Sequence, residues 1–161
     1  MGNIIKVGMA DLKAMRHPAV LTTLGLGSCV GIALFDTSTN IIGLAHAMLP
    51  ESSQIKNRAN VAKFVDTAID TLIAKMERLG AAREGIVAKL VGGSQMFAFS
   101  QGSELMRIGH RNVKAAKDKL KQLGIPVIAE DTGGGYGRTI EFDSAMGILL
   151  IKTIGYGIKR I

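Results

Sequence analysis

The chain has 161 residues, of which 47% are hydrophobic, and its 20 basic and 13 acidic side chains give a formal net charge of +7. This length and hydrophobic content predict one folded domain over residues 1–161 and exclude an intrinsically disordered chain. No apolar run approaches the roughly 20 residues of a membrane-spanning helix, and a single cysteine excludes an intrachain disulfide, so we expect no membrane insertion and a cytoplasmic location.

The first half of the chain predicts mostly β-strands. The short β-branched run Ile4–Val7 is typical of a strand, whereas residues 10–18 indicate a polar connection with at most one helical turn. Apolar runs at Val30–Phe35 and Ile41–Met48 flank the polar loop "DTSTN", a combination typical of a β-hairpin. We therefore expect these two runs to form paired antiparallel strands.

The second half alternates between helices and strands. After a polar loop at residues 50–57, apolar residues recur at helical spacing from Arg58 to Leu79 and again from about Arg107 to Leu123, and a glycine follows each run. Strands are expected at residues 86–91, 126–130, 138–143 and 147–154, of which the last two form a hairpin. We therefore predict an α+β fold, a layered sandwich of mostly antiparallel or mixed β-sheet with two long helices packed on it.

Cys29, the only cysteine, follows the glycine-rich stretch "LGLGS" at residues 24–28. Gly25 and Gly27 permit backbone conformations that are closed to other residues, and a turn there exposes main-chain N–H groups. Such a position suits a nucleophile, because backbone N–H groups around Gly27, Ser28 and Cys29 can stabilise the oxyanion that forms when a thiolate attacks a carbonyl. A lone cysteine is otherwise a small buried hydrophobe, and that interpretation stays open.

A thiol nucleophile needs a base, and His46 is the best placed of the three histidines. It interrupts the apolar run "IIGLAHAML", and the predicted hairpin returns its strand beside the one that begins at Cys29. A hydrogen-bonded core histidine would also fit this run. His17 and His110 have polar surroundings and are expected at the surface. The histidines and the cysteine lack the spacing of a metal site, so no metal is expected.

Two further glycine-rich stretches are candidate sites. "DTGGGYGR" at residues 131–138 lacks the Lys-Ser/Thr ending of a P-loop and precedes a predicted strand, which favours a tight turn; nucleotide or RNA binding through Arg138 stays an alternative. "GGSQMF" at residues 92–97 ends a strand and makes Phe97 a candidate docking residue for a partner. Aromatic residues are only 4% of the chain, which leaves few stacking surfaces for bases, so we expect no nucleic-acid partner.

Five separated motifs, taken in order, point to one known family. They are "TLGLGSCVGIALFD" (23–36), "GLAHAMLP" (43–50), "LVGGSQMF" (90–97), "IGHRNV" (108–113) and "EDTGGGYGRTIEF" (130–142). With them the chain resembles the CheD-type chemoreceptor glutamine deamidases over nearly its whole length. Ser94 departs from the family pattern, in which Ala is common, at a position expected to lie away from the site.

The resemblance implies hydrolysis of specific glutamine side chains to glutamate on the cytoplasmic helices of methyl-accepting chemotaxis receptors, without a cofactor. It implies that Cys29 is the nucleophile, His46 the base and Thr23 the third member, with Thr22 as the neighbouring alternative. It also implies a CheC-type phosphatase as a partner, and we expect a monomer when the chain is free. The competing hypothesis is a non-catalytic module that binds a signalling protein and merely packs its cysteine.

Overall fold

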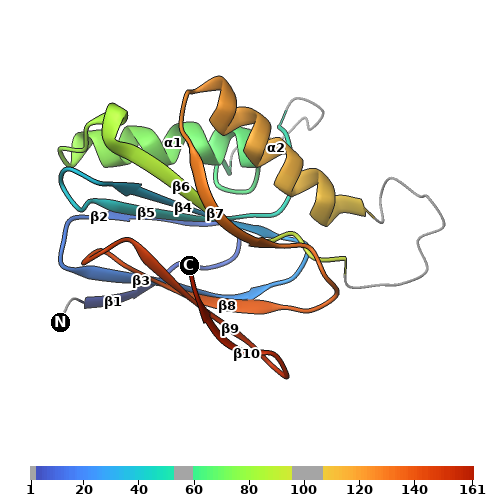
Figure 1. The fold of residues 1–161 in the computed structure, drawn as a ribbon. Coiled ribbons are helices and arrows are strands. Elements are labelled where there is room, and N and C mark those ends of the chain that lie inside the picture. Colours follow the sequence, from blue (N-terminus) through green and yellow to red (C-terminus); the bar gives the residue numbers. More distant parts are fainter. Residues whose placement is uncertain (1–2, 53–59, 96–106) are drawn as a thin grey trace.

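The computed structural model describes residues 3–52, 60–95 and 107–161, and their elements form three layers (Figure 1). Two five-stranded β-sheets lie face to face, and helices α1 (Val65–Arg78) and α2 (Ile108–Gln122) cover the outer face of one of them. The predicted α+β sandwich with two helices packed on a sheet is therefore confirmed. Within these ranges, no helix combines the length and the hydropathy needed to cross a bilayer.

The strands divide into a helix-covered sheet and a second sheet. In spatial order, the helix-covered sheet contains β2 (Leu12–Met15), β5 (Ile42–Ala47), β4 (Val30–Asp36), β6 (Ile86–Gly92) and β7 (Val127–Thr132). The second sheet contains β1 (Asn3–Lys6), β3 (Ala19–Leu26), β8 (Arg138–Asp143), β9 (Ile148–Thr153) and β10 (Gly157–Arg160). Neighbouring strands are antiparallel except for two parallel pairs, β1 with β3 and β6 with β7. A short 3₁₀ turn at Arg83–Gly85 leads into β6.

Apolar side chains fill the spaces on both faces of the helix-covered sheet. Helix α1 buries Leu72, Ile73 and Met76, which recur at helical spacing, against this sheet. A fully buried side chain of this kind contributes about 1.5–3 kcal/mol relative to an exposed one. Because β4 and β5 lie between the helices and the second sheet, both strands are almost entirely buried. This burial explains their continuous apolar sequences and leaves His46, in β5, only 1% exposed.

The pairing of strands corrects some of the expectations from sequence. Residues 12–15 form β2 instead of a polar connection, because they pair with β5 at the edge of the helix-covered sheet. Helix α1 begins at Val65, because the carbonyl of Lys63 is held by the N–H groups of Met48 and Leu49 before the helix starts. The expected start at Arg58 lies outside the described residues.

Two strands were not indicated by the sequence at all. In strand β3 burial alternates only from Ala19 to Thr23, and the alternation then breaks at a register shift between Thr23 and Leu26, where Gly25 has a positive φ of 67°. All four residues of strand β10 are exposed, and among the described strands it pairs with β9 alone, so it carries no apolar pattern that would mark it.

Candidate active site

Thr23 and His46 meet between the two sheets. Thr23 lies on β3 of the second sheet and His46 on β5 of the helix-covered sheet, and Thr23 Oγ1 is 2.7 Å from His46 Nδ1. Both residues are buried, with exposed fractions of 0% and 1%. The neighbouring Thr22 instead donates its hydroxyl to the carbonyl of Ile140 on the adjacent strand, so it is Thr23 that contacts the imidazole.

A second hydrogen bond of Thr23 fixes the proton on His46. Thr23 Oγ1 lies 2.7 Å from the carbonyl oxygen of Val7, and only the hydroxyl proton can join two oxygens at that distance. Thr23 must therefore accept the other hydrogen bond from His46, so that Nδ1 carries the imidazole proton. The lone pair of the neutral ring is then on Nε2, which is buried and has no hydrogen-bond partner within the part of the chain that the structure describes.

Cys29 lies on the face of the helix-covered sheet that carries His46. The pairing of β4 with β5 sets Gly31 opposite His46 and Val30 opposite Ala47. Cys29 precedes Gly31 by two residues, so its side chain shares the inter-sheet face and is diagonal to His46. The thiol is 8% exposed and forms no hydrogen bond with Nε2 in this resting arrangement.

The three carbonyls around the cysteine each accept a hydrogen bond from outside the loop. The carbonyl of Gly27 accepts from Ser94 N (2.8 Å), that of Ser28 from Asn112 Nδ2 (2.9 Å), and that of Cys29 from Gly93 N (2.8 Å). These peptide bonds are trans, so each following N–H points away from the carbonyl before it. The N–H of Ser28 therefore points away from Ser94, and the N–H of Cys29 points away from Asn112. A donor to an oxyanion has to be free of such anchors.

The end of β6 has glycines because the backbone approaches the cysteine loop closely. Gly92 has a φ of 105°, and a Cβ on it would lie 2.5 Å from the carbonyl oxygen of Cys29. Gly93 has a φ of 64° and lies against Gly109 and Val113 of α2, where a Cβ would collide. The glycine pair thus lets one strand end contact both the cysteine loop and the helix.

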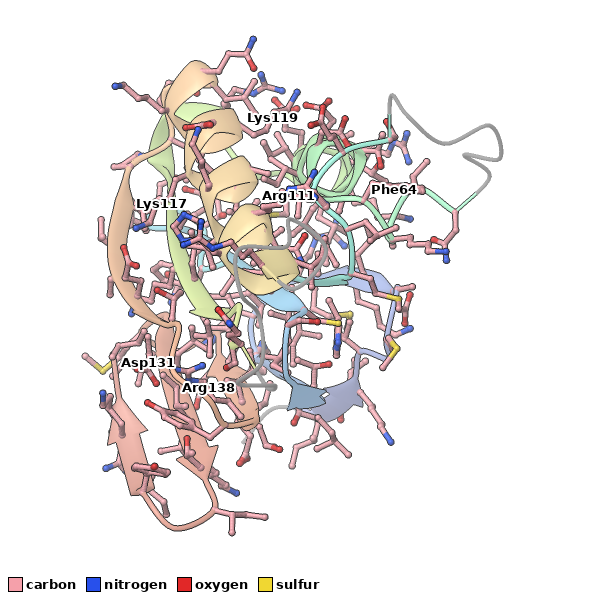
Figure 2. All side chains as sticks on the ribbon, turned by 90° about the vertical axis from the view of Figure 1, so that its right-hand side faces the viewer. Phe64, Arg111, Lys117, Lys119, Asp131 and Arg138 are labelled. Carbon is pink, nitrogen blue, oxygen red and sulfur yellow. The ribbon has the colours of Figure 1, made fainter. Side chains whose placement is uncertain are left out.

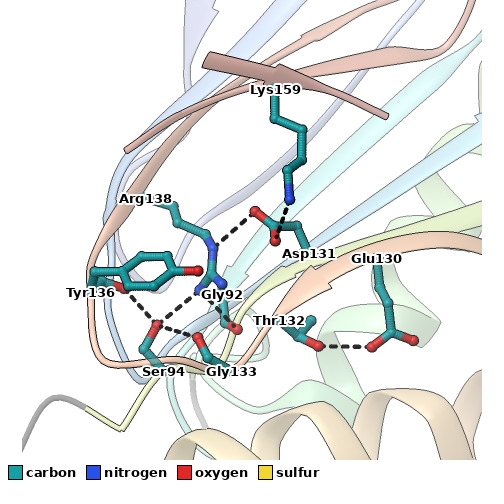
Figure 3. A network of polar contacts seen from close by, with 9 residues as sticks. All are labelled: Gly92, Ser94, Glu130, Asp131, Thr132, Gly133, Tyr136, Arg138 and Lys159. Carbon is teal, nitrogen blue, oxygen red and sulfur yellow. Dashed lines mark hydrogen bonds and ion pairs between the residues drawn. The ribbon is translucent and has the colours of Figure 1, made fainter. Parts of the chain in front are cut away.

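A largely buried polar network also contacts the end of β6 (Figure 3). Arg138 has a side chain that is only 1% exposed, and it forms an ion pair with Asp131 at 3.2 Å; Figures 2 and 3 show the two side by side. Arg138 Nη1 also donates to Ser94 Oγ (2.9 Å), and Ser94 Oγ donates to the carbonyl of Tyr136 (2.6 Å). Lys159 pairs with Asp131 from the exposed side (3.3 Å). The network therefore links β7, β8 and β10 to the residues that anchor the cysteine loop.

This network corrects the expectation that Ser94 lies away from the site. The N–H of Ser94 holds the carbonyl of Gly27, and its hydroxyl joins Arg138 to the same segment. The network also decides how to interpret "DTGGGYGR". Because the guanidinium of Arg138 is buried and bonded to Asp131, it is not available to a nucleotide, and the stretch serves as a turn.

Burial sets the resting protonation of the candidate pair. Loss of hydration raises the pKa of the Cys29 thiol, an effect that the hydrogen bond from its own backbone N–H partly offsets. Burial also lowers the pKa of His46. Near neutral pH the pair is therefore a protonated thiol and a neutral imidazole, in which Nε2 can accept a proton.

The other residues singled out from the sequence lie elsewhere. His17 is exposed, and its Nδ1 lies 2.8 Å from Ser144 Oγ; His110 is also exposed. Phe97 falls outside the described residues. Among the described residues, no group of three or more His, Cys, Asp or Glu side chains could hold a metal ion. Asn112, which contacts the cysteine loop, was not identified from the sequence. The sequence feature that could have indicated Asn112 is an amide side chain on the buried face of an amphipathic helix.

Comparison with known proteins agrees with these features. A family model described as CheD chemotactic sensory transduction matches residues 48–153. Over its full length the chain is 53% identical to the "Probable chemoreceptor glutamine deamidase CheD" of Lachnoclostridium phytofermentans, and it covers all of that protein. The chain belongs to the CheD family. The resemblance seen in the sequence motifs is therefore confirmed.

A second CheD relative supports the same assignment. The protein of the same name from Caldanaerobacter subterraneus subsp. tengcongensis is 54% identical over 158 residues, which is 98% of each chain. Both alignments extend over the segment with Thr23, Cys29 and His46, which the family model does not reach. Among solved structures, the Bacillus licheniformis hypothetical protein YfiH overlaps with a TM-score of 0.47 at 14% identity, over 77% of this CheD chain and 49% of that chain.

Proposed function

We propose that this chain hydrolyses the side-chain amides of specific glutamines to glutamates on methyl-accepting chemotaxis receptors. The names of its full-length relatives support this activity and this substrate. The observation that carries the chemistry is the state of His46. Its Nδ1 proton is committed to Thr23, and its buried Nε2 is unpaired among the described residues on the face that Cys29 shares.

In the proposed reaction, His46 Nε2 takes the thiol proton of Cys29, and the sulfur forms a bond to the side-chain amide carbon of the glutamine. The imidazolium then gives this proton to the departing nitrogen, the C–N bond breaks, and ammonia leaves a thioester on Cys29. A water attacks the thioester while Nε2 accepts one of its protons. The C–S bond breaks, and the proton returns to the sulfur as glutamate is released.

The surroundings of the pair fit the charges that arise in this scheme. When His46 becomes an imidazolium, its Nδ1–H continues to donate to Thr23, so the ring does not have to turn. The amides of Ser28 and Cys29 are the proposed oxyanion donors, because their peptide units are anchored through the opposite carbonyls. The thiol and Nε2 form no hydrogen bond in this structure, and catalytic hydrogen bonds of this kind are often long before the reacting groups approach one another.

Two further parts of the proposal concern partners. The family resemblance supports binding of a CheC-type phosphatase, with the chain monomeric when it is free. The net charge of +7 favours acidic surfaces on a partner or substrate, so association should weaken as salt concentration rises.

The test is mass analysis of receptor cytoplasmic fragments after incubation with the protein. The wild type should produce the Gln-to-Glu mass change, whereas Cys29→Ala and His46→Gln should not. A wild type that binds the fragment and leaves every glutamine unchanged would instead support the alternative of a binding module. That alternative is motivated by the buried, protonated state of the Cys29 thiol.

A further inference from the structure

Asn112 connects the segment that carries Cys29 to the segment that carries His46. This residue of α2 is fully buried, and its Nδ2 donates both to the carbonyl of Ser28 (2.9 Å) and to the carbonyl of Met48 (3.0 Å). Ser28 directly precedes Cys29, and Met48 follows His46 by two residues. One side-chain amide thus bridges two backbone segments that each neighbour a member of the candidate pair.

The bridge lies where the β-ladder between these segments ends. The last paired residues of β4 and β5 at this end are Val30 and Ala47. Beyond them the chain after β5 turns toward α1, and the N–H of Met48 donates to the carbonyl of Lys63 instead of to β4. The two N–H groups of Asn112 therefore take the place of the next ladder bonds, and they hold Ser28 and Met48 at a fixed separation.

Asn112 is an unusual choice for the buried face of a helix, and its two donated bonds are its distinguishing feature. Its Oδ1 is buried and has no hydrogen-bond partner within the described ranges, and a buried acceptor without a partner destabilises a fold. The rest of the buried face of α2 is formed by residues such as Val113, Ala116 and Leu120. An apolar side chain would avoid the unpaired Oδ1 but would take the donor away from the carbonyls of Ser28 and Met48, so the contribution of the amide lies in the two bonds that it donates.

We propose that Asn112 is a positioning residue that sets the separation of Cys29 Sγ and His46 Nε2. This inference rests on the proposed function, because it assumes that these two atoms exchange a proton. Without the bridge, Ser28 remains attached through its neighbours, whose carbonyls Gly93 and Ser94 hold, but it is no longer tied to the segment after His46. A displacement of about 1 Å between reacting groups lowers a rate by about 100-fold.

The first experiment compares Asn112→Leu with Leu120→Ala. Leu120 is buried on the same helix and in the apolar core, so its truncation loosens α2 without removing a bond to Ser28 or Met48. In the glutamine mass assay, Asn112→Leu should lower kcat about 100-fold and leave KM nearly unchanged. Leu120→Ala should keep kcat while its melting temperature falls. Equal losses of kcat in the two variants, or a kcat for Asn112→Leu close to wild type, would overturn the inference.

The second experiment needs no substrate and separates the inference from the proposed function. The rate at which iodoacetamide alkylates Cys29 is measured at one fixed pH, with and without His46→Gln, in the wild type and in Asn112→Leu. The expected result is that His46→Gln slows alkylation in the wild type and has no further effect in Asn112→Leu. The same dependence on His46 in both backgrounds would refute a role for Asn112.

The outcomes are distinguishable from failure of the deamidase proposal. If no receptor glutamine changes mass but the coupling between Cys29 and His46 disappears in Asn112→Leu, the positioning role stands and the substrate is wrong. If His46→Gln does not alter alkylation in the wild type, the pair itself is refuted, and the role of Asn112 with it. Should Asn112→Leu fail to fold, Asn112→Ala, which removes both donors without adding volume, replaces it under the same criteria.

Discussion

Replacing Thr23 by valine tests whether the tautomer of His46 matters. Valine has nearly the shape of threonine and a high β-propensity, so β3 should keep its packing. The change removes the hydroxyl that donates to the carbonyl of Val7 and accepts from His46 Nδ1. Thr23→Ser is the matched control, because it keeps the hydroxyl and loses only the methyl group.

The magnitudes follow from the two hydrogen bonds that are lost. The carbonyl of Val7 and the Nδ1–H of His46 are both left buried without a partner, at about 1–3 kcal/mol each. In a domain of this size, each kcal/mol lowers the melting temperature by about 2–4 °C. For the rate, the imidazole proton is free to move to Nε2, which then cannot accept from Cys29. If the preference for the proton on Nδ1 falls by about 1.4–2.8 kcal/mol, kcat decreases by about 10–100-fold.

The assay combines deamidation kinetics on a receptor fragment with thermal unfolding of the same samples. Thr23→Val should lie between the wild type and Cys29→Ala or His46→Gln, because Thr23 orients the base but transfers no proton itself. Thr23→Ser should resemble the wild type. If Thr23→Val abolished activity as completely as Cys29→Ala while remaining folded, or if Thr23→Ser were as slow as Thr23→Val, the explanation by tautomer would be refuted.

Two further outcomes concern stability. Because burial lowers the pKa of His46 below that of an unfolded histidine, the unfolded chain binds more protons as the pH falls through about 6.5, and the folded state loses stability there. Urea unfolding at about pH 7.5 and about pH 5.5 should therefore show a larger loss for the wild type than for His46→Gln; equal losses would mean that the imidazole is protonated as easily as in water. In the network of Figure 3, Arg138→Met leaves the carboxylate of Asp131 without its buried partner and should cost about 3–5 kcal/mol, whereas Lys159→Met removes an exposed partner and should cost about 0–1 kcal/mol. The check is urea unfolding of both variants. If Arg138→Met and Lys159→Met unfolded at the same urea concentration, Arg138 would not be the stabilising partner of Asp131.

The amino-acid sequence by itself determined the fold class, the two helices and the central hairpin. These features depend on local patterns: apolar residues at helical spacing in α1 and α2, and the polar "DTSTN" loop between two apolar runs. The hairpin prediction also put the strand of His46 beside the strand that Cys29 leads into; β4 and β5 do pair in this way, and Cys29 lies directly before β4. The motifs led to the CheD family because several short stretches recur in a fixed order.

Only the tertiary structure decided what each side chain of the site contacts. The proton on His46 depends on Thr23 and, through it, on Val7, which belongs to a different part of the chain. Ser28 is held by Asn112, 84 residues away in the sequence. Such contacts have no local pattern, because they form between sheets and layers whose approach is set by the packing of the whole domain. Strands β2, β3 and β10 could not be predicted from the sequence for the same reason. They exist because a partner strand satisfies their backbone hydrogen bonds, and the local sequence does not show that partner.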